Sequence, residues 1–409
     1  MSTLKSSSDH LTINADGADK DLKFQLNGVQ KADLSSAGLT VVGDIIPSSP
    51  MSHRNMIING DMQVWQRATA ATTVVSSSYQ TVDRWSWVDS GAGVWTTERH
   101  NMALAELNTT GHRTALKIVV TSADTSVAAG DYQYIRTKIE GQDMQSLQYG
   151  TANAKTVTLS FWVKSSLAGV YCTGLLLYSS TTYFCPQEFT ISDADTWEKK
   201  TITITPTAGS TSLVTGAGGL VDNDNTQGLA VLFNLMAGSS ITGGTTNTWA
   251  TANQATSNQT NLFASTHNFY LTGVQLELGS SATPFEHRTY GDVLDQCDRY
   301  YQKYSYDLTS AEYTGLVGWN TSTVQMYAPF MFRKEMRAAP TGTATAGGTW
   351  EHEDTGGTTT LVDTPVLDVS GRYSCRFYAA GMYGLNDGEG CSLRRRSTYT
   401  SYFDLDAEL

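Results

Sequence analysis

The stretch that decides the fold reads Leu271-Thr-Gly-Val-Gln-Leu-Glu-Leu-Gly279, followed by Ser280-Ser-Ala-Thr-Pro-Phe-Glu-His-Arg-Thr-Tyr290. Its first part alternates between apolar and polar residues, with Val274, Leu276 and Leu278 on one face and Gln275 and Glu277 on the other. This period of two predicts a β-strand with one buried face. Pro284 ends the pattern, and a short helical stretch that includes Cys297-Asp-Arg-Tyr-Tyr-Gln302 is expected beyond it.

The composition of the whole chain favours β structure. Its 409 residues give room for two or three domains. Charged residues are only 16% of the total, whereas aromatic residues reach 10%, with 9 Trp and 20 Tyr. Because Thr, Ser and Gly are also abundant, we expect an all-β protein with many short strands and polar turns.

The formal net charge of −12 argues against a nucleic-acid partner, since such proteins are usually basic or carry a basic face. The run Arg394-Arg395-Arg396 is expected to be a solvated loop. The beginning of the chain lacks the apolar core of a signal peptide, and no apolar stretch has the length of about 18 residues that a membrane span needs. We therefore expect a protein made in the cytoplasm, without membrane insertion.

The five cysteines are scattered, with no Cys-x-x-Cys pair, and their odd number argues against a disulfide framework. We expect them to be buried apolar thiols.

Residues 1–50 form a separate N-terminal segment in this interpretation. His10-Leu-Thr-Ile-Asn-Ala-Asp-Gly17 is a predicted short strand that ends in an Asp-Gly turn, and Lys23–Lys31 continues as strands around Asn27-Gly28. A unit of this size has little core of its own, so neighbouring copies are expected to share their apolar faces. Two prolines and three serines in residues 45–52 mark the boundary that follows.

Residues 53–288 contain about ten strand patterns separated by turn residues, the count expected of an antiparallel two-sheet β-sandwich or jelly roll. Within them, residues 238–266 are rich in Thr, Asn and Gly and predict a long exposed loop that contains Trp249 and Phe263. Residues 289–409 are expected to form a small C-terminal β-sandwich with one short helix, placed at residues 291–304.

Three stretches of the middle region resemble the jelly-roll carbohydrate-binding modules of the galactose-binding-like type. They are Asn55-Met-Ile-Ile-Asn-Gly-Asp-Met-Gln63, Thr156-Val-Thr-Leu-Ser-Phe-Trp-Val-Lys-Ser165 and Asp195-Thr-Trp-Glu-Lys-Lys-Thr-Ile-Thr-Ile204. The join at residues 271–302, the added Val82-Asp-Arg-Trp85, the N-terminal segment and the ending Asp406-Ala-Glu-Leu409 resemble bacteriophage tail-fibre and virion receptor-binding proteins.

The resemblance implies a virion protein of the phage tail that adheres to a host cell-surface polysaccharide or lipopolysaccharide without catalysis. It also implies a homotrimer whose N-terminal segment attaches to phage tail or adaptor proteins. Two alternatives stay open: a structural virion protein, such as a head fibre, decoration or connector, that binds other phage proteins, and a glycan-cleaving tailspike.

Motifs of enzyme sites are missing from the sequence: it has no Gly-x-Ser-x-Gly, no His-Glu-x-x-His and no phosphate loop. The seven His residues are dispersed, so neither a metal site nor a cofactor is expected. Related carbohydrate-binding modules hold Ca²⁺ near their last strand, but Thr272 and Gly273 replace the acidic pair there. Asp222-Asn-Asp-Asn225 is expected to be a plain turn, with calcium as the alternative.

Sugar binding needs flat aromatic side chains for the C–H face of the ring and polar partners for its hydroxyls. The candidate residues for glycan binding are Tyr132, Tyr134, Trp249, Trp87, Trp95 and Arg136. For each aromatic residue the alternative is a place in the core of the sandwich.

Overall fold

The computed structural model describes residues 22–26, 29–35, 38–41, 52–71, 78–209, 213–306, 313–361, 363–396 and 399–409. The chain divides into two compact units, Met1–Ser52 and His53–Leu409. Within the described residues, every pairing between named strands is antiparallel. The all-β prediction is therefore confirmed. No helix in the described part of the chain is long and apolar enough to cross a membrane.

The N-terminal unit contains a three-stranded sheet of β1 (Leu22–Leu26), β2 (Val29–Ser35) and β3 (Gly38–Val41), in that order. Phe24 lies opposite Ala32 across β1 and β2, and Leu34 follows on the same face. Phe24 and Leu34 are about half exposed, at 50% and 51%. The strand predicted at residues 10–17 lies outside the described residues.

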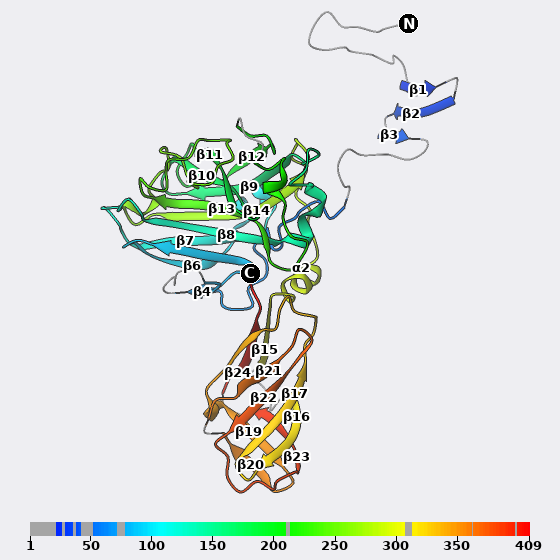
Figure 1. Ribbon diagram of the computed structural model, residues 1–409, viewed down its shortest axis with the longest axis vertical. Coiled ribbons are helices and arrows are strands. Elements are labelled where there is room, and N and C mark those ends of the chain that lie inside the picture. Colours follow the sequence, from blue (N-terminus) through cyan, green and yellow to red (C-terminus); the bar gives the residue numbers. More distant parts are fainter. Residues whose placement is uncertain are drawn as a thin grey trace, which may run out of the picture. The chain divides into compact units, whose positions relative to one another are not determined.

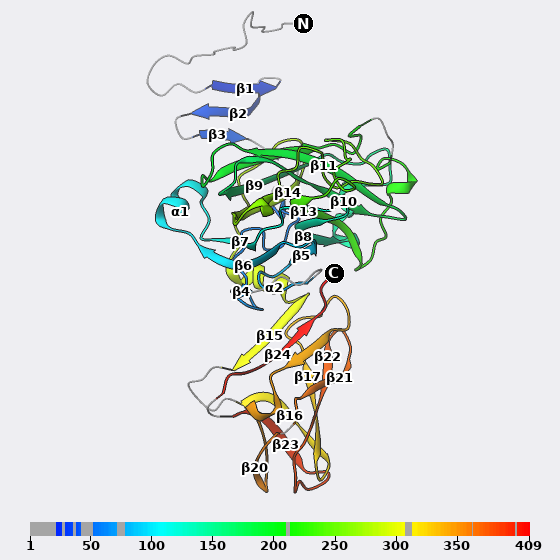
Figure 2. The same cartoon turned by 90° about the vertical axis from the view of Figure 1, so that its left-hand side faces the viewer.

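The second unit begins with an antiparallel sandwich, whose two sheets form stacked layers in Figures 1 and 2. The five-stranded sheet has, in spatial order, β11 (Thr182–Ile191), β10 (Gly169–Tyr178), β13 (Gln227–Ala237), β8 (Tyr132–Glu140) and β5 (Trp85–Ser90). The six-stranded sheet has β12 (Glu198–Ile204), β9 (Val157–Ser165), β14 (Asn268–Leu278), β7 (Thr114–Ser122), β6 (Val94–Asn101) and β4 (Ala70–Ala71).

The main hydrophobic core lies between these two sheets. Alternate residues of β9, such as Leu159 and Phe161, point into it, as do Val231 and Phe233 of β13. The rings of Phe161 and Phe233 meet edge to face, with 4.9 Å between their centroids. The period of two along each strand thus fills the core, as the sequence predicts.

Both outer strands of the five-stranded sheet receive one further bridge. Ser78 pairs with Trp87 of β5, and Ala250 pairs with Phe184 of β11. Ala250 belongs to residues 238–266, which fold back onto the sandwich: the Trp249 indole donates to the Thr205 carbonyl over 2.9 Å, and Phe263 is fully buried against Trp95. The prediction of an exposed loop is therefore wrong for the aromatic residues of this segment, because they complete the core.

α1 (Leu104–Thr110) contacts the outer side of the six-stranded sheet through Glu106. Glu106 of α1 accepts hydrogen bonds from the Lys164 ammonium, at 2.7 Å, and from the Trp197 indole, at 2.9 Å. Burial alone would raise the pKa of Glu106, but these hydrogen bonds lower it to about 2. The carboxylate therefore stays charged and ties the helix to this side of the sandwich.

The opening segment of the second unit, residues 53–63, is joined to β14 by the buried Asn55. The Asn55 amide donates to the Val274 carbonyl (3.0 Å), and its oxygen accepts from the Leu276 N–H (3.1 Å), so the side chain replaces a missing peptide partner. Gly60 must be glycine, because a Cβ there would lie 2.1 Å from the Val274 oxygen. Gly273 has a φ of +61°, where β14 shifts its register against β9.

The remaining residues form a second β-sandwich with its own core. Its three-stranded sheet contains β15 (Tyr301–Tyr306), β24 (Ser401–Asp406) and β18 (Thr341–Ala344). Its seven-stranded sheet contains β20 (Gly357–Thr360), β19 (Trp350–Asp354), β23 (Gly390–Arg395), β16 (Tyr313–Ser322), β17 (Gln325–Met331), β22 (Ser374–Ala380) and β21 (Val366–Ser370). A short 3-10 helix at Gly347–Thr349 precedes β19. In the first sandwich, short 3-10 helices lie at Gly141–Leu147, Ala217–Gly219 and Leu262–Ala264.

The one short helix expected here is α2 (Tyr290–Cys297), which begins at Thr289, whose hydroxyl accepts from the Asp292 N–H. Val293 and Cys297 pack against Val64 of the first sandwich. The prediction that the helix continues to residue 304 is wrong, because β15 pairs with β24 from Tyr301 onward. The apolar spacing of Tyr300, Tyr301 and Tyr304 therefore belongs to an irregular turn and a strand.

The two sandwiches of the second unit meet around a buried carboxylate, Glu140, which is fully inaccessible to solvent. Arg299 binds it with two N–H groups, each at 2.7 Å, and the Tyr300 hydroxyl donates to it over 2.6 Å. Burial would raise the pKa of Glu140, but the hydrogen bonds from Arg299 and Tyr300 lower it below its ordinary value.

A second set of contacts at this junction comes from Arg84, which is 1% exposed. Its guanidinium lies 3.4 Å from the centre of the Tyr300 ring and forms an ion pair with Glu408. Val82-Asp-Arg-Trp85 of the first sandwich and Cys297–Gln302 after α2 are therefore direct partners, and both views place the C-terminal end of the chain beside α2.

We expect Asn55→Ala to lower the free energy of unfolding by about 2–4 kcal/mol, because it leaves the buried Val274 carbonyl and Leu276 N–H without a partner. Urea unfolding measures this change. Asn101→Ala is the matched control, since Asn101 is exposed, and it should change stability by less than about 0.5 kcal/mol. Equal effects of the two substitutions would contradict the role given to Asn55.

Glu140→Gln should destabilise the second unit by about 3 kcal/mol, because it leaves Arg299 facing a neutral group at a buried site. The control is Glu335→Gln, which breaks the more exposed ion pair with Arg372 (2.7 Å) and should cost less than about 1 kcal/mol. Thermal unfolding of both variants tests this order, and a smaller loss for Glu140→Gln than for the control would refute it.

Candidate functional site

The candidate site is the side of the five-stranded sheet that faces away from the main core. Along β8, Ile135 and Ile139 point into the core, so the alternate residues Tyr132, Tyr134, Arg136 and Lys138 point to the opposite side. Three of the six predicted glycan-binding residues, Tyr132, Tyr134 and Arg136, therefore share one face because they are two residues apart on one strand.

Neighbouring strands complete a surface that we name the outer face. Its members are Ser86 and Val88 of β5, Tyr132, Tyr134, Arg136 and Lys138 of β8, Ala230 and Leu232 of β13, Leu176 and Tyr178 of β10, and Phe184 of β11. The apolar members form a cluster separate from the main core. This side of the sheet thus has an aliphatic floor with aromatic and polar groups around it.

The aromatic and polar groups of the outer face contact one another. The rings of Tyr132 and Tyr134 lie 5.7 Å apart with 30° between their planes. Arg136 donates to the Tyr178 hydroxyl over 3.3 Å and lies 3.4 Å from the Ser86 hydroxyl, so both bonds are long. Such weak internal bonds leave the guanidinium able to exchange these partners for a ligand oxygen.

The ionisation of this face follows from its burial. Burial raises the pKa of Tyr134 to about 12, against a smaller opposing effect of Arg136, and it also raises the pKa of Tyr178. Both phenols are therefore neutral at physiological pH and can donate hydrogen bonds. At the end of the face, burial lowers the pKa of Lys138 to about 7, and its ammonium donates to the Leu409 carbonyl over 2.6 Å.

Exposure differs among these residues. Tyr134 is only 7% exposed, whereas Tyr132, Arg136, Tyr178 and Phe184 are half-buried. A ligand on the outer face would thus meet Tyr132, Tyr178 and Arg136 directly, and Tyr134 would support them from below.

An open pocket of about 570 Å³ adjoins the outer face at Tyr178. Its polar lining includes Ser179, Ser180, Thr182 and Asp222. A pocket of this size can hold a small ligand. It adds hydroxyl and carboxylate groups beside the outer face.

The other three predicted residues are corrected by the structure. Trp87, Trp95 and Trp249 are 0%, 1% and 1% exposed, and Trp87 and Trp95 meet edge to face, with 6.0 Å between their centroids. Trp87 lies on the core side of β5, one residue before the outward Val88. These indoles fill the core and cannot contact a ligand in this structure.

Residues that the prediction did not select are Tyr178, Ser86 and Phe184. They reach the outer face from β10, β5 and β11 through cross-strand pairs such as Leu176 with Phe184 and Ser86 with Arg136. These pairings join residues far apart in the sequence, so no local pattern marks them. The alternation of Leu176 and Tyr178 could have indicated only that these two share a side.

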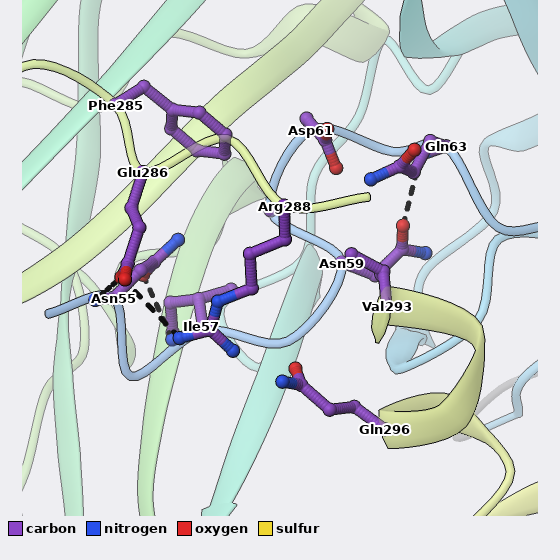
Figure 3. A pocket seen from close by; sticks show the side chains of 11 residues that line it. Asn55, Ile57, Asn59, Asp61, Gln63, Phe285, Glu286, Arg288, Val293 and Gln296 are labelled. Carbon is purple, nitrogen blue, oxygen red and sulfur yellow. Dashed lines mark hydrogen bonds and ion pairs between the residues drawn. The ribbon is translucent and has the colours of Figure 1, made fainter. Parts of the chain in front are cut away.

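A second small pocket lies where the opening segment meets residues 285–296 (Figure 3). Its space is about 10 Å³, room for about one water molecule. Glu286 accepts hydrogen bonds from the backbone N–H groups of His53 (2.6 Å) and Asn55 (2.8 Å). Figure 3 shows the Glu286 side chain directed at Asn55, so the pocket belongs to the joint between segments rather than to a ligand site.

His112 lies beside this joint, 3% exposed, with its ring 4.8 Å from that of Phe285 and 5.3 Å from that of His287. Burial, together with the charges of His287 and Lys199, lowers the pKa of His112 to about 4. The folded protein therefore favours the neutral ring.

No group of three His, Cys, Asp or Glu side chains within the described residues is arranged to hold a metal ion. In the turn Asp222–Asn225, Asp224 accepts from Thr226, and the Asn225 amide donates to the Arg337 carbonyl over 2.5 Å. This turn therefore contacts the second sandwich.

Comparisons with known proteins return no matching family model and no matching curated sequence. Solved structures with a similar arrangement include tailspike protein 4 of bacteriophage CBA120, in its enzymatically active domain, at 10% identity and a TM-score of 0.30. That match covers 55% of this chain, and the chain spans only 21% of the tailspike chain.

Others contain carbohydrate-binding modules of Clostridium thermocellum. The family 11 module in complex with a mixed-linked tetrasaccharide has 12% identity and a TM-score of 0.26, covering 53% of this chain and 99% of the module. Modules of xylanase 10B complexed with xylohexaose have 9% identity and a TM-score of 0.25, covering 53% of this chain and 30% of theirs. Likenesses this distant carry no argument about function, which depends on the geometry of this chain.

The His112 site predicts a pH dependence of stability. Because the unfolded chain binds a proton near pH 6.5 and the folded protein only near 4, stability contributed by the neutral ring is present above pH 6.5 and is lost toward pH 4. The loss should approach about 3 kcal/mol. Urea unfolding across this window should show a weaker dependence for His112→Asn, whereas the exposed control His53→Asn should keep it. A dependence unchanged in His112→Asn would contradict the assignment.

Proposed function

We propose that this protein is a non-catalytic adhesin of a phage tail fibre that binds a host cell-surface polysaccharide or lipopolysaccharide through the outer face. The observation that carries the proposal is the gathering of Tyr132, Tyr134 and Arg136 with Tyr178 on one side of the five-stranded sheet. These four side chains combine flat apolar surface with hydrogen-bond donors.

The chemistry of a sugar fits these groups. The C–H face of a hexose stacks on an exposed ring such as Tyr132, and a neighbouring hydroxyl can accept from Arg136. Further hydroxyls would reach Ser179, Ser180 and Thr182 in the adjoining pocket. Each of these groups offers a modest contact. Modest contacts suit a polysaccharide, whose repeating units can make many of them.

The proposal that binding is non-catalytic rests on the carboxylates. Glycoside hydrolysis generally uses two carboxyl groups on either side of the scissile bond. Among the described residues that make up the outer face and its pocket, Asp222 is the one carboxylate. Glu140 is held by Arg299 and Tyr300, and Glu98 pairs with Lys117.

The N-terminal unit supports the expectation of a homotrimer. A three-stranded sheet with Phe24 and Leu34 half exposed on one face gains stability when copies share that face. In this proposal the unit joins the copies and attaches them to phage tail or adaptor proteins, so the location is the virion. Several copies on one particle would raise the avidity of weak single contacts.

A structural virion protein is the second candidate, favoured by an apolar surface on the seven-stranded sheet. Trp319 is 44% exposed, and its ring lies 6.3 Å from that of Tyr327, which lies 5.7 Å from that of Tyr378. Val317 and Met331 nearby are 63% and 71% exposed. Such a surface is typical of a contact with another protein.

The test is competition for phage adsorption by the purified protein. The protein should reduce adsorption to host cells, and Tyr132→Ala with Arg136→Ala should weaken this effect by about tenfold, because stacking and a charged hydrogen bond are lost together. The control is Tyr383→Ala, which removes a 76% exposed tyrosine outside the outer face.

Two outcomes would count against the adhesin. Competition that the double variant retains would show that the outer face is not the binding surface. A folded oligomer that does not compete at all would favour the structural candidate. Release of oligosaccharides from the host glycan would instead support a tailspike enzyme.

A further inference from the structure

A pocket of about 610 Å³ lies at the junction of the two sandwiches. Residues of both sandwiches line it: Arg67, Ala68, Ala70, Ala71, Tyr79 and Gln80 from the first, and Tyr301, Lys303, Thr341, Thr343, Tyr402, Asp404 and Asp406 from the second. We name it the junction pocket. Its existence depends on the contacts around Glu140 and Arg84, which hold β15 and β24 against the first sandwich.

The charges of the junction pocket balance. Two cations, Arg67 and Lys303, face two carboxylates, Asp404 and Asp406. Asp404 and Asp406 are two residues apart on β24, so both lie on the same side of that strand. An anionic ligand would meet the carboxylates and a cationic ligand the two cations, so the balance favours a neutral ligand.

Arg67 lies among several carboxylates. Its side chain is 7% exposed, and its Nη2 donates to Asp406 over 2.9 Å and lies 3.4 Å from Glu408. Its Nη1 forms an ion pair with Asp83 at 3.8 Å, and its guanidinium lies 3.7 Å from the centre of the Tyr301 ring. Arg67 therefore contributes positive charge to the wall of the pocket and holds Asp406 and Tyr301 in place.

The other groups offer both donors and acceptors. Asp404 accepts from the Tyr301 hydroxyl (2.9 Å) and from Thr343 (2.6 Å), while Asp406 keeps 39% of its side chain exposed. The Lys303 ammonium donates to the Arg67 carbonyl over 3.0 Å and lies 4.3 Å from the centre of the Tyr402 ring. Tyr79, Tyr301 and Tyr402 add apolar ring atoms between these polar groups.

We propose that the junction pocket is a second saccharide-binding site, which takes one or two neutral sugar units. Its volume falls in the range of small-ligand pockets. Hydroxyl groups both donate and accept, so they match a pocket in which carboxylates, an ammonium group and a guanidinium lie side by side, and sugar C–H groups match the tyrosine rings. This site does not rest on the function of the outer face.

Saturation-transfer NMR tests the proposal on the full chain with Tyr132→Ala, which removes the stacking ring of the outer face, and the methyl glycosides of glucose, galactose, mannose and N-acetylglucosamine. Transfer is expected to at least one glycoside at millimolar concentration. In the same background, Thr341→Trp should reduce it by about tenfold, because Thr341 is exposed at the rim of the pocket and the indole would fill the space. Thr323→Trp, at an exposed threonine outside the pocket, should leave transfer in this background unchanged.

Ala70→Trp, from the opposite wall of the junction pocket, gives a second way to fill it should Thr341→Trp fail to fold. Transfer to none of the four glycosides would overturn the proposal, as would transfer that survives a folded filling variant. Loss in Tyr132→Ala alone would also overturn it and would assign the sugar to the outer face, so failure of this proposal is distinguishable from failure of the adhesin.

Discussion

The constraint on which the rest of this structure depends is the pairing of one carboxylate that water cannot reach. Glu140 ends β8 inside the protein, and a charge in that position is tolerable only with close partners of opposite sign. Arg299 supplies them, and its place just after α2 fixes where Tyr300 and Tyr301 lie. From there β15 begins and pairs with β24, so this ion pair fixes the position of the second sandwich together with the contacts of Arg84.

β8 ends with Glu140 at the junction of the two sandwiches. It also contributes to both the core and the outer face, because successive side chains of a strand point in opposite directions. Ile135 and Ile139 of β8 enter the core, whereas Tyr132, Tyr134 and Arg136 form the centre of the outer face. The residues proposed to bind the glycan are thus held by a strand with partners on both sides, β13 and β5, rather than by a loop. Their spacing is set by the backbone and needs no ligand to form.

The sequence could predict what depends on neighbours along the chain. Alternation predicts the strand at residues 271–278, which lies in β14. Tyr132, Tyr134 and Arg136 are candidates by residue type, and β8 shows that they share a side. The sequence does not decide which side of β5 faces the other sheet, so Trp87 is a candidate for glycan binding there although it is a core residue. The helical spacing of Val293 to Tyr304 was likewise ambiguous, because the pairing of Tyr301 with Asp406 is settled by residues over a hundred positions away. The junction pocket combines Arg67, Lys303 and Asp404, and no local pattern links them.

The single bridges made by Ser78 and Ala250 have a consequence for molecules packed at high density. A sheet whose outermost strand is free presents unpaired N–H and C=O groups that can capture a strand of another molecule and lead to aggregation. Here Ser78 pairs with part of the free edge of β5, and Ala250 pairs with part of the free edge of β11. The five-stranded sheet therefore keeps its broad side open while its margins are partly covered against strand exchange between crowded copies.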